Sequence, residues 1–488
     1  MSDNTPLIDT VHLTGARFDG QWATAAETAE VLEPATGRSL GRVAVCRPAD
    51  IAVAAAGARK SQKPWAGLTP DDRAGVLRKA AELAQTHWAE ITGWIMRESG
   101  SVRAKAEFEL SITIKALHLA SAMPHQAQGQ ILPSEPGRLS LARRRPLGVV
   151  GVISPFNFPL YLAMRAVAPA LAVGNAVVLK PDPRTAICGG VVIARLFELA
   201  GLPAGALHLT PGGGDAGEAL CSDPNVAMIQ FTGSTGAGRR VGETASRNLK
   251  KVSLELGGKN SLIILEDADL DLAVKNAAWA AWLHQGQICM SAGRILVQRS
   301  IMDAFATALA EKANQLPVGD PMSDQVALGP LINQPQLDHA LSILDQTRGA
   351  GAEILAGGTA EGLFLKATVI KGVTPAMSAY SDEIFGPVAV LIPFDTDAEA
   401  IALANDTEYG LSAAVLSKDL GRAMAMGEEL HAGLIHINDQ TVNDDVVNPF
   451  GGVGASGNGT SIGGPANWEE FTHWQWFTMK ASAPAYPF

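Results

Sequence analysis

The sequence predicts an α/β protein with a doubly wound parallel sheet, a second α/β unit and a small β-hairpin element. Three observations predict it. The chain has 488 residues, which is enough for two or three domains of about 150 residues each. Strands and helices alternate regularly between residues 147 and 238, as in a parallel sheet covered on both faces. A second series runs from about residue 261 to 437, with helices expected at 270–284 and 302–315 and a strand at 388–392.

The part of the chain before residue 122 is expected to be mostly helical. From about residue 50, apolar side chains recur at three- and four-residue spacing, as Leu77, Ala80 and Leu83 illustrate. The segment 133–137, which contains Pro and Gly, then separates two short extended runs, the second of which is at 139–145. A β-hairpin is the simplest interpretation of this pattern.

The regular alternation after the hairpin divides into four strands, each followed by a helix. Strands are expected at 147–154, 176–180, 206–209 and 226–231, and helices at 160–172, 189–200, 216–221 and from near Gly238. In a sheet of this type, a nucleotide-like ligand binds at the carboxyl ends of the strands.

The segment 468–488 is unusually apolar for its position, with Trp474, Trp476, Tyr486 and Phe488 among its side chains. Large apolar side chains are unfavourable in water when many lie together. Two interpretations stay open: the segment packs on another subunit, or it packs on its own lobe.

Composition and charge exclude several classes of protein. The 38 basic and 49 acidic side chains give a net charge of −11, and no basic run exceeds the arginines at 143–145, so nucleic-acid binding is not expected. Apolar stretches end well before the roughly 18 residues of a membrane span, and the first residues do not resemble a signal peptide. We therefore expect a cytoplasmic protein without a membrane partner. The four cysteines and the acidic and histidine residues lack metal-ligand spacing, so no metal is expected.

Cys289 has unusual neighbours for a cysteine. It follows the sequence Gln-Gly-Gln-Ile, just after a helix expected to end at His284, and should lie on a turn or at a helix start. Such a position can lower the pKa of a thiol and make it a nucleophile. A buried structural cysteine is the alternative, because free cysteines are often buried.

Two further side chains have the chemistry of catalytic groups. Glu255 is the single acid of an apolar strand expected at 252–259, where loss of water would raise its pKa toward the range of a general base. A salt bridge to Lys259 is the alternative. Asn157 follows the strand at 147–154, and its amide could donate a hydrogen bond to an oxyanion. Asn in such a place more often caps the next helix.

Two features suit a nucleotide. The segment 231–238, Phe-Thr-Gly-Ser-Thr-Gly-Ala-Gly, lies between a strand and a helix, where backbone N–H groups and the helix dipole favour phosphate. Because it is not a GxGxxG motif, a plain turn is the alternative. Lys180 ends the strand at 176–180, on the sheet edge where a ribose or phosphate would bind, and a solvated surface lysine is the alternative.

Taken together, these segments resemble the aldehyde dehydrogenase superfamily over essentially the whole chain. The matching segments, in order, are Pro-Phe-Asn-Phe-Pro at 155–159, Leu-Lys-Pro at 179–181, Phe-Thr-Gly-Ser-Thr at 231–235, Leu-Glu-Leu-Gly-Gly-Lys at 254–259, Gly-Gln-Ile-Cys at 286–289, Glu-Ile-Phe-Gly-Pro at 383–387 and Pro-Phe-Gly-Gly at 449–452. Within the superfamily, residues 178–184 and 284–290 look similar to bacterial benzaldehyde and vanillin dehydrogenases.

The resemblance implies oxidation of an aldehyde to the free carboxylic acid with a nicotinamide cofactor. Cys289 would attack the aldehyde carbon, while the Asn157 amide and the Cys289 backbone N–H hold the oxyanion. After hydride transfer, Glu255 would activate the water that hydrolyses the thioester. Superfamily members that pass the acyl group to coenzyme A usually lack this glutamate, so hydrolysis is expected.

NAD is the cofactor that the resemblance implies, with NADP as a second possibility. The residues expected at the cofactor are Lys180 and Glu383 at the riboses, Ser234 at the pyrophosphate, Phe385 beside the nicotinamide, and Ser154, Phe156, Gly233 and Gly257 around them. Many NAD-preferring members carry a glutamate three residues after the lysine, where this chain has Pro183 followed by Arg184. The carboxylate that would repel a 2′-phosphate is therefore expected to be absent.

The substrate is expected to be an aromatic aldehyde. The residues expected around it are Phe158, Tyr161, Leu162, Arg165, Leu283, Ile288, Val442 and Phe450, an apolar set with flat rings. Arg165 stands where relatives commonly place a bulky aromatic, and it could donate a hydrogen bond to a ring substituent. Ser461 stands where relatives often have an acid, so the acid that would relay a proton from Glu255 is absent at that position. A generalist that oxidises aliphatic aldehydes is the alternative.

The resemblance also implies a division of the chain and an assembly. Residues 1–125 and 146–257 would form a Rossmann-like dinucleotide-binding domain, 258–455 the catalytic domain, and 126–145 with 456–488 the oligomerisation element. A homodimer or homotetramer is expected. A thiol esterase or hydrolase and a non-catalytic protein of the same fold are rival functions, but neither explains Lys180, Glu383 and the glycine-rich turn together.

Overall fold

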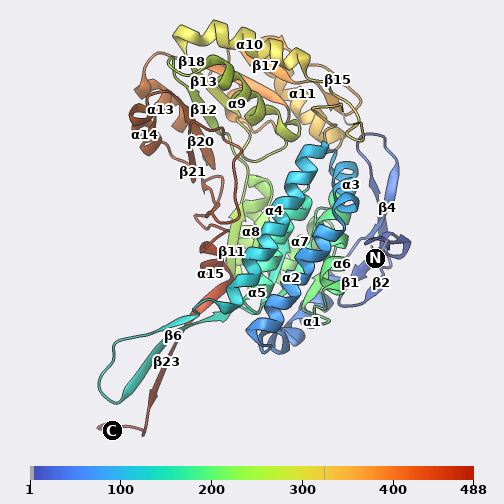
Figure 1. The fold of residues 1–488 in the computed structure, drawn as a ribbon, viewed down its shortest axis with the longest axis vertical. Helices are drawn as coiled ribbons and strands as arrows, with labels where there is room; N and C mark the ends of the chain where they lie inside the picture. Colours follow the sequence, from blue (N-terminus) through green and yellow to red (C-terminus); the bar gives the residue numbers. More distant parts are fainter. Residues whose placement is uncertain (1–4, 324) are drawn as a thin grey trace.

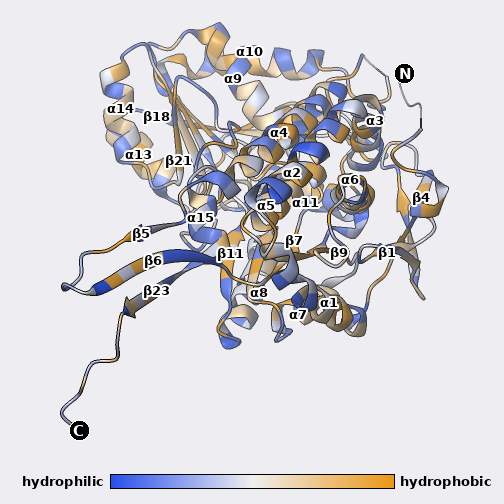
Figure 2. Cartoon of the chain, turned by 60° about the horizontal axis from the view of Figure 1, so that its bottom comes forward, coloured by the Kyte–Doolittle hydropathy of each residue, from blue (hydrophilic) through white to orange (hydrophobic). Residues whose placement is uncertain are grey.

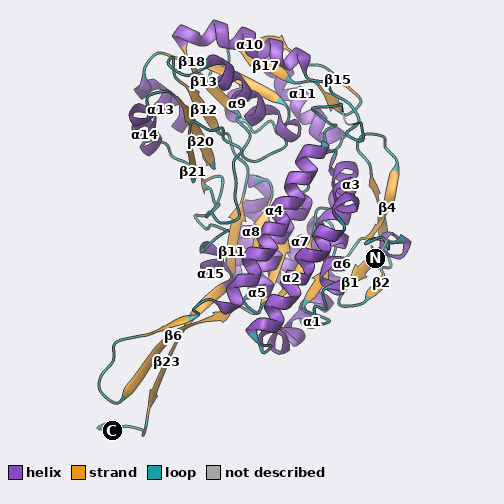
Figure 3. Cartoon of the chain, viewed as in Figure 1, coloured by secondary structure: helices purple, strands orange, loops and turns teal. Residues whose placement is uncertain are grey.

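The structure is a computed structural model that describes residues 5–323 and 325–488. Two seven-stranded sheets with their helices form the body, and a three-stranded sheet leaves it as a long arm (Figure 1). Figure 3 shows that helices flank the sheets and that the arm consists of strands and loop. The predicted α/β class with a doubly wound parallel sheet and a hairpin element is confirmed.

The first sheet is parallel except at one edge. In spatial order its strands are β11 (Lys251–Glu255), β10 (Met228–Thr232), β7 (Val149–Ile153), β8 (Ala176–Lys180), β9 (Leu207–Leu209), β1 (Ala16–Phe18) and β2 (Trp22–Thr24). Ile153 on β7 lies beside both Lys180 and Phe231 in the ladder. The carboxyl ends of these strands therefore share one edge, which is where such sheets bind ligands.

Helices cover both faces of this sheet, because successive strand residues point to opposite sides. Val149 and Val178 pack with α1 (Pro48–Ala66) and α7 (Gly214–Ser222). Their neighbours Val150 and Val177 belong to the opposite apolar cluster. That cluster includes residues of α2 (Pro70–Thr86), α3 (Trp88–Ser99), α4 (Arg103–Ala122), α5 (Pro159–Ala172) and α6 (Val192–Leu199).

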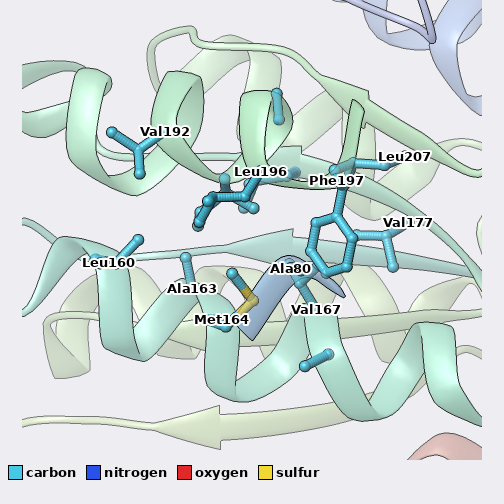
Figure 4. Packing of buried hydrophobic residues seen from close by; sticks show 14 of the residues in the cluster. Ala80, Leu160, Ala163, Met164, Val167, Val177, Val192, Leu196, Phe197 and Leu207 are labelled. Atoms are coloured by element: carbon cyan, nitrogen blue, oxygen red, sulfur yellow. The ribbon is translucent and has the colours of Figure 1, made fainter. Parts of the chain in front are cut away.

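Figure 4 shows part of that second cluster, in which Met164 and Val167 of α5 approach Phe197 of α6 beside Val177 of the sheet. These side chains are fully buried. Burial of such side chains contributes about 1.5–3 kcal/mol each. The packing fixes α5 against the sheet, and the segment just before α5 carries Asn157.

The second sheet repeats this arrangement. Its strands, in spatial order, are β14 (Glu353–Ala356), β17 (Thr368–Lys371), β18 (Val388–Phe394), β13 (Arg294–Gln298), β12 (Ser261–Ile264), β20 (Ser412–Leu416) and β21 (Leu434–Ile437). Alternate residues again belong to opposite clusters, as Leu262 and Ile263 show. The helices around it include α9 (Leu270–Trp282), α10 (Met302–Gln315), α11 (Gln334–Gly349), α13 (Asp397–Asn405) and α14 (Leu420–Glu428).

Most predicted elements are present, although several begin or end a few residues from the expected position, and two of these differences bear on the site. α8 (Thr235–Arg247) begins before the expected Gly238, because the Ser234 hydroxyl accepts a hydrogen bond from the Ala237 backbone N–H at 3.4 Å and caps the helix. β11 ends at Glu255, short of the expected strand end, because its neighbour β10 also ends at that level. Glu255 thus lies at the carboxyl end of its strand.

The arm consists of β5 (Gly129–Ile131), β6 (Arg138–Pro146) and β23 (Thr472–Lys480). β5 pairs antiparallel with β6, which confirms the hairpin, and β23 pairs antiparallel along β6. Figure 2 shows the arm standing away from the body. Trp476 is 70% exposed and Tyr486 is 73% exposed. The interpretation that the C-terminal aromatics pack on their own lobe is therefore wrong for the chain beyond α15 (Ala466–Phe471).

Across the described residues, the helices are all too short or too polar to span a bilayer.

Candidate active site

Cys289 lies where two cavities meet. A cleft of about 880 Å³ runs along the carboxyl edge of the first sheet, and a smaller cavity of about 240 Å³ lies among α4, α5, the turn after α9 and the loop after β21. Cys289 and Asn157 line both. The two residues predicted to act on the same carbonyl group therefore lie at the shared wall.

The turn that carries Cys289 has an unusual backbone. α9 ends at Trp282, earlier than expected, and the φ angles of His284, Gln285 and Gly286 are 49°, 56° and 66°. Positive φ is costly for residues other than glycine and persists where surrounding contacts enforce it. Here Nε2 of Gln285 donates to two backbone oxygens, that of Gly100 at 2.9 Å and that of Pro330 at 2.8 Å. These buried hydrogen bonds hold the turn in place.

Two side-chain amides fix the turn from opposite sides. Nδ2 of Asn157 donates to the Gln287 carbonyl oxygen at 2.9 Å, and Nδ2 of Asn260 donates to the Cys289 carbonyl oxygen at 2.8 Å. Asn157 does not cap α5, whose N-cap residue is Phe158 and has no side-chain cap, so the capping interpretation is wrong. An amide nitrogen carries two N–H groups, so Asn157 retains a second donor in the wall that it shares with Cys289.

The thiol of Cys289 is less acidic than the sequence suggested. Burial raises its pKa, and the carboxylates of Glu383 and Glu255 raise it further. The expectation of a lowered pKa is wrong because Cys289 lies on a buried turn and not at a helix N-terminus. The resting thiol is therefore protonated.

Glu255 is buried without a counter-ion in contact. Its side chain is 4% exposed, and neither carboxylate oxygen has a hydrogen-bond partner among the described residues. Burial raises its pKa well above the ordinary value, as predicted. The salt-bridge alternative is wrong, because Nζ of Lys259 instead donates to the Asp382 carbonyl oxygen at 2.6 Å. Glu255 lies behind the walls of both cavities, outside the described residues that line them.

The large cleft gathers all the residues expected at the cofactor. These are Ser154, Phe156, Lys180, Gly233, Ser234, Gly257, Glu383 and Phe385. Lys180 is 7% exposed, so the surface-lysine alternative is wrong. Oε1 of Glu383 accepts a hydrogen bond from the Gly258 backbone N–H at 3.1 Å, and burial raises the pKa of Glu383 to about 7. A Cβ atom on Gly257 would lie 2.2 Å from Oε2 of Glu383, so a side chain at this position would displace the Glu383 carboxylate.

The N-terminus of α8 opens onto this cleft, since Gly233, Ser234 and Ala237 line it. A helix N-terminus presents free N–H groups and partial positive charge to an anion. Nearby, the rings of Phe156 and Phe385 meet edge to face at 5.8 Å between centroids. This end of the sheet therefore combines an anion site with aromatic walls.

Asp182 supplies a carboxylate to the cleft. This carboxylate was not predicted from the sequence. Both its oxygens are occupied by Arg184: Nε donates to Oδ1 at 2.9 Å and Nη2 to Oδ2 at 2.7 Å. The guanidinium also lies over the Phe156 ring, 4.2 Å from its centroid. The cleft wall thus carries a paired carboxylate and cation at this point.

The smaller cavity is lined by seven of the eight residues expected around the substrate: Phe158, Tyr161, Leu162, Leu283, Ile288, Val442 and Phe450. Arg165 is the exception. It lies behind the wall, with its guanidinium 4.5 Å from the Phe450 ring centroid, and Nη2 donates to the Ile462 carbonyl oxygen at 2.9 Å. Its expected place facing the substrate is wrong, because these contacts hold it in the protein interior.

Sequence reasoning missed a buried ion pair on α4. Nζ of Lys105 donates to Oε2 of Glu109 at 2.5 Å and to the Asn157 carbonyl oxygen at 2.6 Å. Oε1 of Glu109 accepts the backbone N–H groups of Leu160 at 2.8 Å and Tyr161 at 3.2 Å. Lys and Glu four residues apart on a helix usually form a surface pair, so the sequence signal was ambiguous. The pair fixes the segment that carries Asn157.

Comparison with known proteins agrees with this geometry. Residues 22–477 match the aldehyde dehydrogenase family. A vanillin dehydrogenase of Amycolatopsis sp. is 52% identical over 484 residues, covering 99% of this chain and 100% of that protein. A benzaldehyde dehydrogenase (NAD(+)) of Pseudomonas putida is 48% identical over 476 residues, covering 97% and 98%. The crystal structure of betaine aldehyde dehydrogenase from Staphylococcus aureus in complex with NAD+ has a TM-score of 0.95 at 30% identity, covering 98% of this chain and 97% of that one. The chain belongs to the aldehyde dehydrogenase family.

Proposed function

We propose that this protein oxidises an aromatic aldehyde to its carboxylic acid with NAD, through a thiohemiacetal and a thioester on Cys289. The observation that carries the proposal is the position of this thiol, between a cleft that suits a dinucleotide and an apolar cavity of about 240 Å³. A nucleophile in the shared wall can reach a substrate in one cavity while a cofactor occupies the other.

The roles of the catalytic residues follow from their places. The Cys289 sulfur attacks the aldehyde carbon and loses its proton, and the Asn157 amide with the Cys289 backbone N–H donates to the oxyanion. NAD, when bound, accepts the hydride that the thiohemiacetal carbon loses. Glu255 takes a proton from the water that attacks the thioester, which requires its side chain to turn from behind the wall toward the sulfur. The Cys289 thiolate is the leaving group and takes up the proton that Glu255 removed from the water, so the proton that the thiol lost on attack is the one released to solvent.

NAD fits the large cleft through this chain's own residues. The N-terminus of α8 with Ser234 suits the pyrophosphate, while Lys180 and Glu383 suit ribose hydroxyl groups. The P. putida relative is named for NAD(+), and the S. aureus structure contains NAD+. We further propose that NADP is accepted as well, because Arg184 offers a cation to a 2′-phosphate and already occupies the Asp182 carboxylate.

The aromatic substrate is supported by the walls of the smaller cavity. The rings of Phe158, Tyr161 and Phe450 line it, and Phe108 and Trp279, each about half exposed, also line it. Flat rings pack well against other flat rings. Two relatives that cover nearly the whole chain are named for vanillin and benzaldehyde. An aliphatic or broad aldehyde preference is the alternative.

We also propose the domain division, assembly and location expected from the sequence. Residues 1–125 with 146–257 would bind the dinucleotide, 258–455 would carry the thiol, and 126–145 with 456–488 would join subunits in a homodimer or homotetramer. The exposed aromatics of the arm support the last part, since Trp476 is 70% exposed. A cytoplasmic location suits the four unpaired cysteines.

The test is absorbance of the reduced nicotinamide with NAD or NADP and a panel of benzaldehyde, vanillin and hexanal. We expect kcat/KM to favour the aromatic aldehydes by about tenfold or more, equivalent to about 1.4 kcal/mol of transition-state preference. A preference for hexanal would contradict the substrate class and leave the chemistry intact. Absence of reduction with every pair, alongside ester hydrolysis without cofactor, would favour the hydrolase alternative.

A further inference from the structure

Asp444 places a carboxylate in the wall of the otherwise mostly apolar aldehyde cavity. It lies in the loop after β21, six residues before Phe450, and its side chain is 9% exposed. It lines the same cavity as Cys289, and its charge contributes to the raised pKa of that thiol, so the two groups are neighbours. A carboxylate at this position would face a substrate held for attack by the thiol.

The orientation of Asp444 is fixed through one of its two oxygens. Oδ2 accepts a hydrogen bond from the Tyr161 hydroxyl at 3.0 Å and another from Nη1 of Arg165 at 2.7 Å. Arg165 is itself held by the Ile462 carbonyl oxygen and packs over the Phe450 ring. A charged pair with this much support is preorganised and does not collapse when a ligand enters.

The second oxygen of Asp444 is free for a ligand. Oδ1 accepts no hydrogen bond from any residue that the structure describes, and the side chain retains exposure at the cavity wall. A ligand that covers this oxygen without donating a hydrogen bond binds less tightly, because the oxygen loses its hydrogen bonds to water and gains none in return. A ligand that donates one recovers that free energy. The cavity therefore favours a guest that has an apolar ring and a hydrogen-bond donor directed to Asp444.

We propose that Asp444 determines specificity by accepting a hydrogen bond from a hydroxyl group on the aromatic ring. The proposal rests on the proposed function, and it narrows the substrate class to benzaldehydes with a hydroxyl group at the 3- or 4-position. A 2-hydroxyl group is excluded because it bonds to its own carbonyl oxygen. The sequence predicted that Arg165 would donate a hydrogen bond to a ring substituent. Here the protein group is instead an acceptor, because the Arg165 guanidinium lies behind the wall and the Asp444 carboxylate lines the cavity.

A substituent series on the unmodified enzyme tests the donor requirement. The substrates are benzaldehyde, 3- and 4-hydroxybenzaldehyde, and the matching 3- and 4-methoxybenzaldehydes, with NAD in excess and NADH absorbance as the readout. At a pH low enough to keep the hydroxybenzaldehydes as neutral phenols, methoxy and hydroxyl groups alter the carbonyl reactivity similarly, but a methoxy group cannot donate. We expect kcat/KM for one of the hydroxybenzaldehydes to exceed that of its methoxy partner by about tenfold or more, as a hydrogen bond to a charged group allows.

Two variants assign the effect to Asp444. Asp444→Asn keeps the size of the side chain but turns it from a charged acceptor into a neutral amide, and it should reduce the hydroxyl-to-methoxy ratio by about tenfold. Asp445→Asn is the matched control, since it removes the same charge one position along, on a residue outside the described lining of the cavity. It should leave the ratio unchanged.

The outcomes separate this inference from the proposed function. Equal kcat/KM for hydroxyl and methoxy partners in the unmodified enzyme would overturn the inference while benzaldehyde oxidation still stands, and this holds even if Asp444→Asn does not fold. An unchanged ratio in a folded Asp444→Asn enzyme would also overturn it. A preference for hexanal over every benzaldehyde would instead contradict the proposed function itself.

Discussion

The two cavities that meet at Cys289 are built in different ways. The cofactor cleft draws its residues from the ends of neighbouring parallel strands and the turns just after them, such as Lys180 at the end of β8 and Ser234 after β10. The aldehyde cavity draws on helices α4 and α5, the turn after α9 and the loop after β21. In the cleft, the register of the parallel strands places the residues at their carboxyl ends side by side. In the aldehyde cavity, side-chain packing between distant segments decides what faces the ligand.

The polar groups of the two regions differ accordingly. The cleft contains Lys180, Glu383 and Arg184, which short segments of sequence identify, together with Asp182, which pairs with Arg184. The cavity has few polar groups, and Asp444 and Lys105 are both tied into ion pairs with residues on other elements or other turns. Changes in the cleft should therefore alter cofactor parameters alone, and changes in the cavity should alter aldehyde preference alone.

The largest expected effect comes from the residue that the two regions share. Cys289→Ala should reduce NADH formation by about a thousandfold or more, because no thioester can form. Cofactor binding, followed by the fluorescence of bound NADH, should persist. Cys221→Ala is the control, since Cys221 lines the cleft but not the smaller cavity among the described residues. Turnover within tenfold of the unmodified enzyme would rule out the thioester mechanism.

Glu255→Gln should slow hydrolysis of the thioester about a hundredfold, because this step needs a base. Hydride transfer should change much less, so rapid mixing should reveal a burst of NADH, up to one per active site, followed by slow turnover. The rate of this burst is the internal control, because a normal rate shows that the variant still binds the cofactor in the cleft and the aldehyde in the smaller cavity. A steady-state rate and an acyl-enzyme lifetime like those of the unmodified enzyme would remove Glu255 from this role.

A pH titration distinguishes the cleft from the cavity. Burial raises the pKa of Glu383 to about 7, so this group is neutral at lower pH and ionised at higher pH. The ionised form is the better acceptor for ribose hydroxyl groups, so the dissociation constant of NADH should fall about tenfold between pH 6 and 8. Glu383→Gln should flatten that profile. If the aldehyde KM followed the same profile and NADH binding did not, the assignment of Glu383 to the cleft would fail.

The smallest expected effect concerns NADP. Arg184→Ala removes a cation from the cleft and frees the Asp182 carboxylate, so the ratio of kcat/KM for NADP to that for NAD should fall about fivefold. Asp182→Asn should move the ratio in the opposite direction, because it keeps the cation and removes the negative charge. Neither variant should change the preference among aldehydes. A shift of the same sign in both would contradict the pairing argument.

Much of the fold could be predicted from the sequence because local patterns decided it. The strand at 176–180 and the helix at 302–315 have the expected bounds, since apolar runs and their polar flanks define both. The start of α8 was misplaced because the Ser234 cap was not recognised. The early end of α9 depends on contacts with Gly100 and Pro330, which lie far away in the chain.

The sequence by itself determined the order of elements, the family to which the chain belongs, and a nucleophile, an amide donor and a buried acid that could work together. Only the tertiary structure decided their surroundings. Cys289 has a raised pKa where a lowered one was expected. Arg165 was expected to face the substrate, but its side chain pairs with Asp444, which is 279 positions away in the chain. The physical reason is that burial and ion pairing depend on atoms within a few ångströms of a group. Those atoms come from segments that local sequence patterns do not bring together.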